Sequence, residues 1–303
     1  MIKKFNTIID LINTFPDEEA CIKHLENLKW GGNIISPFDP ASKVYVCKGN
    51  RYRCRNTSKY FNVKTNTLFD NSKIPLQKWF LAIWIITCHT KGISSVQLAK
   101  DLGVTQKTAW FLLHRIRNCF SFDNNNVLNN EIEVDETYVG GKNKFRHICR
   151  KVQHSQGRSS KDKTPVFGMI ERSGKLNAKK VNDVSATTLT KQIVSYANKD
   201  ATIYSDEWLG YSQLTKIYNH AIVKHANKEY VNGKVHTNTI EGFWSLFKRG
   251  IIGIYHSVSV KHLQKYVDEF VFRYNTRKHR QDHRFDYLLT HMSCRMTYQS
   301  LTT

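Results

Sequence analysis

The second half of the chain alternates between strand and helix patterns, and this alternation constrains the fold more than any other feature. Strand patterns occur in EIEVDETYVGG (131–141), TPVFGMIER (164–172), KLNAKKVNDV, ATIYSDE (201–207) and HAIVKHA. Helical patterns occur in ATTLTKQIVSYA (186–197), LGYSQLTKIY, NTIEGFWSLFKRGI from residue 238, and VKHLQKYVDEFVFRYN. Several strands followed by strand–helix alternation predict an α/β fold with a mixed sheet.

Three acidic residues stand at notable places in this pattern. Asp135 and Asp206 each end an apolar, β-prone run, and Glu241 lies in a helical pattern. Such residues converge only through folding, and three converging carboxylates require a cation at neutral pH. Mg²⁺ and Mn²⁺ prefer carboxylate oxygens as ligands. The sequence therefore predicts a divalent-metal site.

The helical pattern that contains Glu241 has a core face and a polar face. The apolar residues at helical spacing are Ile240, Phe243, Trp244, Phe247 and Ile251. Glu241, Ser245 and Lys248 fall on the adjoining face. A carboxylate and an ammonium two turns apart suit a metal ligand beside a phosphate-holding lysine. A surface helix with an incidental charge pair is the alternative.

The net charge indicates the kind of partner. The chain has 46 Lys and Arg against 25 Asp and Glu, a net charge of +21. Residues 1–120 carry 18 Lys and Arg against 8 acids, and residues 121–303 carry 28 against 17. Because the excess is spread over both halves, both are expected to face a polyanion, of which nucleic acid is the commonest. A merely soluble basic protein is the alternative.

Hydropathy and cysteine usage indicate the compartment. No segment approaches eighteen uninterrupted apolar residues, and residues 1–20 lack a signal-peptide pattern. We therefore expect no membrane partner and a cytoplasmic, nucleoid-associated location. The seven cysteines are scattered and form no C-x-x-C pair, which argues against a disulfide framework.

The first 131 residues have the patterns of several short segments of different structure. Residues 1–30 have a helical pattern, 31–70 have short alternating runs typical of a small β unit, and 75–87 form a hydrophobic helix that begins at a proline. The Asn-rich segment 121–131 is expected to be unordered and to mark a domain boundary.

Two short helices with a glycine between them are predicted within 92–120. Ser94 and Ser95 can cap the first helix, Gly103 supplies the turn, and Thr105 caps the second. The expected buried residues of the second helix are Ala109, Leu112, Leu113 and Ile116. This is the pattern of a helix-turn-helix DNA-binding domain, although an ordinary helical hairpin is the alternative. The candidate base-contacting residues are Gln106, Lys107 and Thr108.

A basic segment lies between the first two predicted strands of the second half. Residues 142–164 hold eight Lys or Arg and a single Asp. The segment is either a solvated flap or a flap that closes over the DNA backbone, with Lys142, Lys144 and Arg146 as candidate contacts. Arg249, in the helix that carries Glu241, is a further candidate DNA-binding residue.

Four segments in combination are similar to a known family, the DDE transposases of bacterial insertion sequences in the ISXO-like group. They are GISSVQLAKDLGVTQKTAW, IEVDETYVGG, YSDEWLGY and HTNTIEGFWSLFKRG, and the resemblance runs from about residue 20 to residue 280. It implies an RNase H-like catalytic domain at 121–303, a helix-turn-helix domain at 71–120, and an N-terminal helix with a zinc-ribbon-like β unit at 1–70.

The resemblance also implies a catalytic set and a reaction. Asp135, Asp206 and Glu241 would bind two Mg²⁺ or Mn²⁺ ions, with Asp135 shared between them, and Lys248 would hold a phosphate. The reaction would be cleavage of DNA at terminal inverted repeats and transfer of the freed ends into target DNA. A dimer or larger assembly on DNA is expected because two ends must be joined. The alternatives are a nuclease that cleaves without joining and a DNA-binding regulator with a vestigial nuclease-like domain.

The chain departs from these relatives at the zinc ribbon, which usually has two cysteine pairs. Here the corresponding places read ISPFD (35–39) and CRNT (54–57). Cys47 and Cys54 alone cannot supply the four ligands of a structural zinc site. We therefore expect a degenerate ribbon that folds without zinc.

Three further residues lie near the motifs. Glu136 and Glu207 each follow a motif aspartate, so strand alternation predicts that they point to the opposite face of the sheet. His236 precedes the helix that carries Glu241, where it could contact DNA or assist the metal site, and a structural role is the favoured interpretation.

Overall fold

The computed structural model describes residues 4–141, 147–153, 162–223 and 236–303 and shows two compact units. Unit 1 consists of residues 1–120 with 278–303, and unit 2 consists of residues 121–277. One division falls directly after residue 120, whereas residues 278–303, which the family resemblance places in the catalytic domain, group with unit 1. The three-domain assignment itself stays a prediction.

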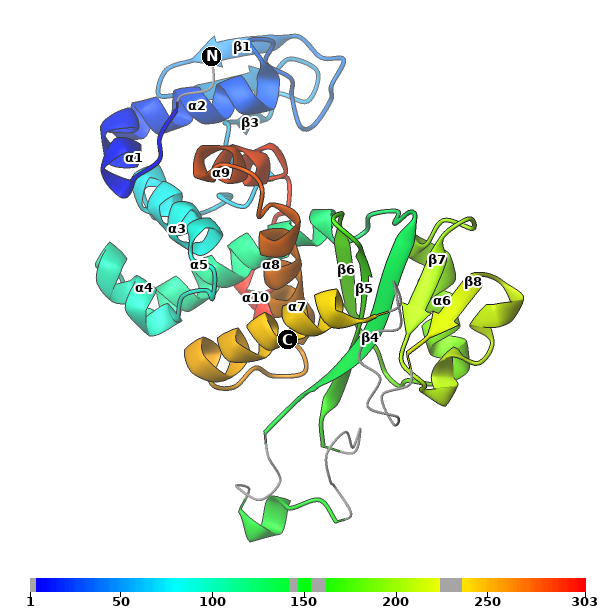
Figure 1. Cartoon of the computed structure of the whole chain (residues 1–303). Coiled ribbons are helices and arrows are strands. Elements are labelled where there is room, and N and C mark those ends of the chain that lie inside the picture. The colour runs from blue at the N-terminus through cyan, green and yellow to red at the C-terminus, as the bar shows by residue number, and fades with distance from the viewer. Residues whose placement is uncertain (1–3, 142–146, 154–161, 224–235) are drawn as a thin grey trace. The chain divides into compact units, whose positions relative to one another are not determined.

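Unit 2 is built on a five-stranded mixed sheet, as the sequence predicts (Figure 1). Its strands are β4 (Glu131–Val139), β5 (Thr164–Glu171), β6 (Leu176–Lys180), β7 (Thr202–Ser205) and β8 (Asn219–Ile222). They lie in the order β6-β5-β4-β7-β8. β5 is antiparallel to β4 and β6, whereas β4, β7 and β8 are parallel. The parallel strands place the chain that follows β7 beside the middle of β4.

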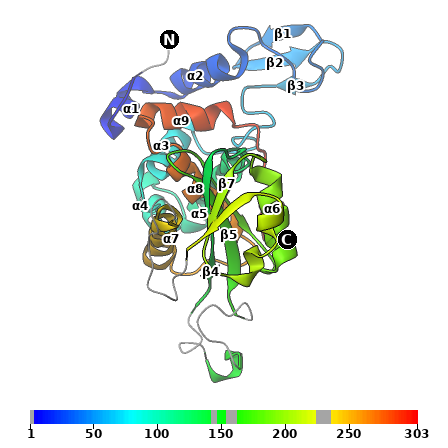
Figure 2. The same ribbon diagram turned by 45° about the vertical axis from the view of Figure 1, so that its right-hand side comes forward.

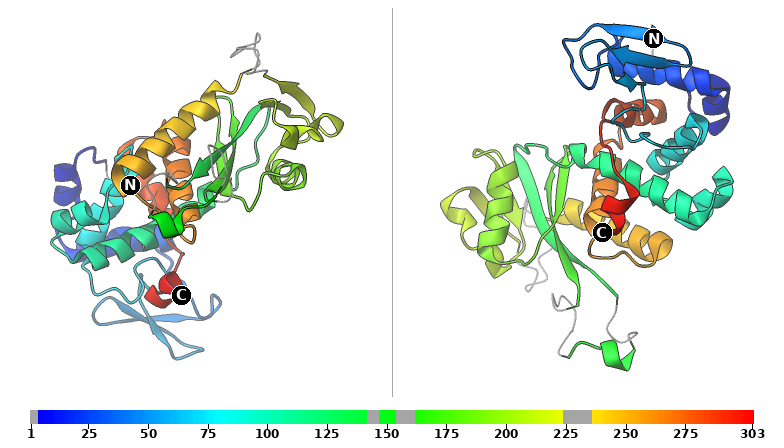
Figure 3. Two further views of the ribbon diagram at one scale, coloured as in Figure 1. Left: turned by 90° about the horizontal axis from the view of Figure 1, so that it is seen from below. Right: turned by 180° about the vertical axis from the view of Figure 1, so that it is seen from behind.

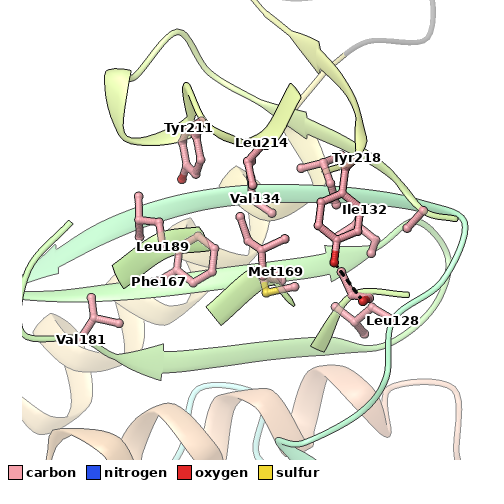
Figure 4. Packing of buried hydrophobic residues seen from close by; sticks show 14 residues of the cluster. Leu128, Ile132, Val134, Phe167, Met169, Val181, Leu189, Tyr211, Leu214 and Tyr218 are labelled. Carbon is pink, nitrogen blue, oxygen red and sulfur yellow. Dashed lines mark hydrogen bonds between the residues drawn. The ribbon is translucent and has the colours of Figure 1, made fainter. Parts of the chain in front are cut away.

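Helices cover both faces of this sheet. α6 (Ala186–Tyr196) packs on one face, where Ile132 and Val134 of β4 join a buried cluster (Figure 4). In the same cluster the Tyr218 hydroxyl donates to the backbone oxygen of Ala197 at 3.2 Å. α7 (Asn238–Gly250) and α8 (Leu263–Asn275) pack on the other face (Figure 2).

The apolar stripe predicted around Glu241 is confirmed. All five of its members are buried: Ile240, Phe243, Trp244, Phe247 and Ile251. The first four lie in α7, and Ile251 begins a π-helical turn (Ile251–Tyr255). Since the stripe faces the sheet, Glu241 and Lys248 remain on the exposed side of α7.

Two sequence-based expectations for unit 2 need correction. The single short helix expected at 209–218 is two 3₁₀ turns (Leu209–Tyr211 and Leu214–Lys216). The Asn-rich segment is ordered, beginning with a 3₁₀ turn (Phe120–Asp123). Asn124 is fully buried, where its amide nitrogen donates to the Ala178 carbonyl and to Asp268 Oδ1 at 2.7 and 2.6 Å. Its amide oxygen accepts from the backbone N–H of Ala178, so these hydrogen bonds attach the segment to β6.

Unit 1 is mainly helical (Figure 3). Its helices are α1 (Ile8–Thr14), α2 (Glu18–Trp30), α3 (Leu76–Cys88), α4 (Ser95–Leu102), α5 (Gln106–Cys119), α9 (Gln281–Thr290) and α10 (Tyr298–Thr302). Phe5, Phe15, Phe80 and Phe285 form an edge-to-face aromatic cluster that joins the N-terminal helices to α9. This cluster explains why the C-terminal segment belongs to unit 1.

The two helices predicted in 92–120 are confirmed as α4 and α5. Ser94 and Thr105 cap them, each through a side-chain oxygen that accepts a backbone N–H of the first turn. Gly103 between them has φ of 58°, the left-handed conformation that glycine adopts without strain. Ser95 is not a cap but the first helical residue, and its hydroxyl accepts from Gln106 Nε2 at 2.8 Å. A role of this pair in DNA binding stays a prediction.

The small β unit predicted in 31–70 is a three-stranded antiparallel sheet of β1 (Val44–Cys47), β2 (Arg51–Cys54) and β3 (Tyr60–Phe61). Cys54 is fully buried. Burial opposes ionisation of its thiol, but hydrogen bonds with the hydroxyls of Ser36, Ser42 and Thr57 outweigh it and lower the pKa of Cys54 to about 6. Hydroxyl groups therefore surround this thiol. The expectation that the unit folds without zinc stays a prediction.

Two further features concern the predictions about the cysteines and about membrane-spanning segments. Cys119 and Cys294, both in unit 1, are joined by a disulfide that the scattered cysteine pattern did not predict. In the part of the chain that the structure describes, every helix is too short or too polar to cross a membrane.

Candidate active site

Asp135 and Asp206 are brought together by the parallel pairing of β4 and β7. The register pairs Glu131 with Thr202 and Glu133 with Tyr204. The next position on the same face of each strand is Asp135 on β4 and Asp206 directly after β7. Because adjacent strands lie about 4.8 Å apart, the two aspartates are neighbours at the end of β7. In open α/β sheets functional groups collect at such strand ends.

Glu241 reaches the same place from α7. A cavity of about 890 Å³ is lined by Asp135, Asp206 and Glu241, the three acids that the sequence singled out. The other lining residues are Glu136, Thr137, Tyr138, Lys163, Glu207, Trp208, Thr237, Trp244, Ser245 and Lys248. Glu241 Oε1 accepts a hydrogen bond from the Thr237 hydroxyl at 2.9 Å, which holds the carboxylate at the first turn of its helix.

The oxygen atoms that line this cavity suit a hard divalent metal, although the three carboxylates do not form one compact group. Among the residues that the structure describes, no three His, Cys, Asp or Glu side chains form a group compact enough to hold a metal ion. Asp135 and Asp206 already lie side by side on the strands, and Glu241 lines the same cavity from α7. Oxygen ligands from three elements are the kind of set that Mg²⁺ and Mn²⁺ take.

Two buried polar atoms in the cavity wall also indicate a polar ligand. The Thr137 hydroxyl and the Trp244 indole N–H are buried and have no hydrogen-bond partner within the described ranges. Thr137 lies two residues after Asp135 on the same face of β4, and Trp244 lies on α7. Buried polar groups nearly always have a partner. Both side chains therefore suit a substrate oxygen or a water that enters the cavity.

A buried carboxylate, Glu133, fixes α7 to the central strand. The Glu133 side chain has no exposed surface. Its Oε2 accepts the backbone N–H groups of Thr239 and Ile240 at 2.9 and 3.1 Å, and its Oε1 accepts the Thr239 hydroxyl at 2.9 Å. A negative charge at a helix N-terminus is stabilised by the helix dipole. Glu133 thus connects the strand of Asp135 to the helix of Glu241.

The positive charge beside Glu133 comes from Arg172. Arg172 Nε donates to Glu133 Oε1 at 2.9 Å, and Arg172 Nη2 donates to the backbone oxygen of His236 at 3.0 Å. His236 Nδ1 lies 3.1 Å from Glu133 Oε1. His236 therefore belongs to this buried anchor of α7 and is absent from the cavity wall.

Gly168 allows α7 to lie close to the sheet at Asp135. Gly168 on β5 is the register partner of Asp135. A Cβ atom at Gly168 would lie 2.5 Å from Trp244 Cζ2 and 3.2 Å from Ile240 Cδ1. Since real Cβ atoms do not approach other atoms so closely, only glycine permits this packing of α7.

Gly168→Ala is expected to lower the free energy of unfolding by about 1–3 kcal/mol, because the added methyl group must displace the Trp244 ring. Gly242→Ala in α7 is the matched control, since a Cβ there meets nothing within 4 Å. In the exposed helix interior alanine should raise stability by about 1 kcal/mol. Denaturant titration followed by tryptophan fluorescence distinguishes the two. Equal effects of both variants would contradict the described packing.

Glu136 and Glu207 also line the cavity. The prediction that Glu136 points to the face opposite Asp135 agrees with its contact with Tyr211, which belongs to the buried cluster on the α6 face. Glu207 follows the end of β7, where strand alternation no longer applies. The Tyr211 hydroxyl donates to Glu136 Oε2 at 2.5 Å. Burial, followed by the charge and hydrogen bond of Glu136 and the charges of Asp135 and Asp206, raises the pKa of Tyr211 well above its usual value. Tyr211 therefore stays protonated and continues to donate to Glu136.

Of the remaining predicted residues, those that the structure describes are absent from the wall of this cavity. Lys142, Lys144 and Arg146 lie outside the described residues. Arg249 is exposed on α7, and its Nε donates to the Ser245 backbone oxygen at 3.3 Å. The candidate base-contacting residues Gln106, Lys107 and Thr108 lie in the first turn of α5 in unit 1. Lys107 Nζ lies 5.1 Å from the centre of the Tyr298 ring.

Four residues of the site and its support were not predicted as functional candidates from the sequence: Glu133, Thr137, Lys163 and Trp244. Glu133 and Thr137 share the strand face of Asp135, and that alternation was the available signal. Trp244 was read only as a core residue. Lys163 lies in the basic segment directly before β5.

The sequence is similar to a known protein family and to a protein of a transposable element. Residues 127–275 match the family described as the ISXO2-like transposase domain. The chain is 28% identical over 276 residues to an uncharacterized protein in the transposable element ISH50 of Halobacterium salinarum. That alignment covers 86% of this chain and 92% of the relative.

Solved structures of Mos1 complexes are also similar to the chain, but only distantly. The pre-cleavage Mos1 transpososome is 13% identical, with a TM-score of 0.28, over 67% of this chain and 75% of the other. The Mos1 mariner paired end complex with Mn is 16% identical, with a TM-score of 0.28, over 65% and 73%. Likeness at this level carries no argument about the present chain.

Proposed function

Because unit 2 of this chain belongs to the ISXO2-like transposase domain family, we propose that the protein is a DDE-type transposase that cleaves DNA and transfers the cut ends. One observation carries the proposal. Asp135 of β4, Asp206 directly after β7 and Glu241 of α7 line one cavity that Lys248 also lines. A cavity with carboxylates and a lysine suits phosphodiester chemistry, in which charge on transferring oxygens must be stabilised.

We infer further that unit 2 has an RNase H-like fold. The strand order β6-β5-β4-β7-β8, with three antiparallel strands followed by two parallel ones, supports this inference. The positions of the acids agree with it. Asp135 lies in the central strand, Asp206 follows its parallel neighbour, and Glu241 lies in a helix on the face with Asp135.

Asp135, Asp206 and Glu241 would hold two Mg²⁺ or Mn²⁺ ions. When bound, such ions activate a water or a DNA 3′-hydroxyl for in-line attack on a phosphodiester. The chain must orient the DNA phosphate beside them. Thr137 and Trp244 have buried donors directed at no protein acceptor within the described ranges, which suits hydrogen bonds to phosphate oxygens. Lys248 supplies a compact positive charge two turns along α7 from Glu241.

DNA ends would be selected by unit 1. We propose that α4 and α5 form a helix-turn-helix in which Gln106, Lys107 and Thr108 contact base edges. The capped helices and the exposed positions of Gln106 and Lys107 support this role. The basic segment with Lys142, Lys144 and Arg146, together with Arg249, would contact phosphates. Joining two ends implies a dimer or larger assembly on DNA.

The test is a strand-transfer assay on the purified full chain. Labelled duplexes that carry the terminal repeats flanking the coding sequence are incubated with supercoiled target DNA and Mg²⁺ or Mn²⁺. The proposal predicts cleaved ends and labelled joint molecules, with both products lost in EDTA. Cleavage without joint molecules would indicate a nuclease. Binding of the repeats without any cleavage would indicate a DNA-binding regulator, and either result would overturn the proposal.

A further inference from the structure

One face of the small sheet in unit 1 carries a row of aromatic and cationic side chains. The register of the three strands places Tyr45 opposite Arg53 and Arg53 opposite Tyr60. The other face of the sheet packs on Trp30 of α2 through Tyr52 and Phe61. Because successive residues of a strand point to opposite faces, the row points away from α2. We call this surface, defined by Tyr45, Arg51, Arg53 and Tyr60, the outer face.

The outer face is exposed and strongly basic. Tyr45 and Tyr60 are 43% and 57% exposed, so part of each ring is open to solvent. The guanidinium groups of Arg51 and Arg53 lie 5.9 and 5.8 Å from the centre of the Tyr60 ring. From residue 40 to residue 69 the sequence has seven Lys or Arg and no Asp or Glu. The surface is therefore complementary to a polyanion that also offers flat apolar groups.

We propose that the outer face binds single-stranded DNA, with unpaired bases stacked on Tyr45 and Tyr60 and phosphates held by Arg51 and Arg53. Aromatic platforms beside cationic side chains are the usual means of binding unpaired nucleic acid, because every base has a flat face that stacks. Bases of an intact duplex are already stacked on one another, so duplex DNA could use only the arginines. The proposal concerns unit 1 alone and does not depend on cleavage by unit 2.

The test uses the full chain in EDTA, so that no cleavage occurs. Anisotropy titrations with a fluorescein-labelled oligothymidylate and with a labelled duplex of the same length give the two affinities. The variant Tyr45→Ala with Tyr60→Ala should weaken single-strand binding by about 10- to 100-fold and leave duplex binding within about twofold. For single-strand binding, the plot of log K against log salt concentration should be less steep by about 0.7 in Arg53→Ala than in the wild type.

Matched variants on the same sheet provide the controls. Tyr45→Phe with Tyr60→Phe keeps both rings and should bind single strands as the wild type does. Val46 follows Tyr45 on β1, points to the opposite face of the sheet and is 77% exposed. Val46→Ala should therefore change neither the single-strand affinity nor the duplex affinity. A single-stranded oligonucleotide with one 2-aminopurine reports stacking directly, because its fluorescence falls when the base stacks on a ring.

Two results would overturn the proposal. In the first, the double alanine variant binds single strands with an affinity within twofold of wild type and quenches 2-aminopurine equally. The other is an equal loss for single strands and duplex, which would indicate phosphate contacts without stacking. If the double alanine variant does not fold, Arg53→Ala decides through the salt slope, since an unchanged slope would exclude a phosphate contact.

Discussion

Asp135→Asn is expected to lower DNA strand cleavage by about 10³-fold while leaving DNA binding within about twofold of wild type. Asparagine has nearly the same shape as aspartate but lacks the negative charge that a divalent metal requires. Loss of one carboxylate from a metal-assisted site removes about 4 kcal/mol of transition-state stabilisation, which corresponds to this factor. Cleavage rates on an end-labelled duplex and anisotropy titrations in EDTA measure the two quantities separately.

Asp200→Asn is the control for this prediction. Asp200 is exposed, lies shortly before β7, and is absent from the cavity wall. Its replacement makes the same change of charge in the same unit and should leave cleavage unchanged. Cleavage by Asp135→Asn within tenfold of wild type would exclude Asp135 from the catalytic set.

Glu133→Ala is expected to lower the free energy of unfolding of unit 2 by about 3–5 kcal/mol. The substitution leaves the Arg172 guanidinium, whose side chain is 16% exposed, without its main counter-charge. It also leaves the N–H groups of Thr239 and Ile240 without an acceptor at the start of α7. Since α7 carries Glu241, any folded fraction should require a higher Mg²⁺ or Mn²⁺ concentration for half-maximal cleavage.

Two variants separate positioning from stability in this prediction. Glu133→Gln keeps an acceptor for the helix N–H groups but not the charge, so it should lose less stability than Glu133→Ala. Glu131→Gln alters the carboxylate two residues earlier, which is 40% exposed and accepts hydrogen bonds from Tyr204 and Arg172. It should leave the metal requirement unchanged. A wild-type metal requirement in folded Glu133→Gln would show that Glu133 does not position Glu241.

Much of unit 2 could be predicted from local pattern. Apolar runs that end in acids predicted the strands of Asp135 and Asp206. Helical periodicity predicted both the buried stripe of α7 and the exposed side with Glu241. Such predictions succeed because burial of apolar side chains stabilises a helix with one apolar face. Asp135 and Asp206 meet because β4 and β7 are parallel, which places the residue after β7 beside the middle of β4. Glu241 joins them only through the packing of α7 on the sheet.

Features that depend on contacts between distant segments could not be predicted. Glu133 resembles any other acid in a strand, and only its distant partners Arg172 and Thr239 show that it is a buried anchor. Asn124 was expected in an unordered segment because asparagine favours turns, yet its amide pairs with β6. The grouping of 278–303 with unit 1 depends on the packing of Phe285 against Phe5 and Phe80.

Crystals of the full chain soaked in Mn²⁺ test the central claim most directly, through anomalous diffraction at the manganese edge. The account predicts anomalous peaks in the cavity of unit 2, with carboxylate oxygens of Asp135, Asp206 and Glu241 at about 2.2 Å from manganese. It also predicts that these peaks vanish in Asp135→Asn. Manganese bound elsewhere, or bound at the cavity without contact to all three carboxylates, would contradict it.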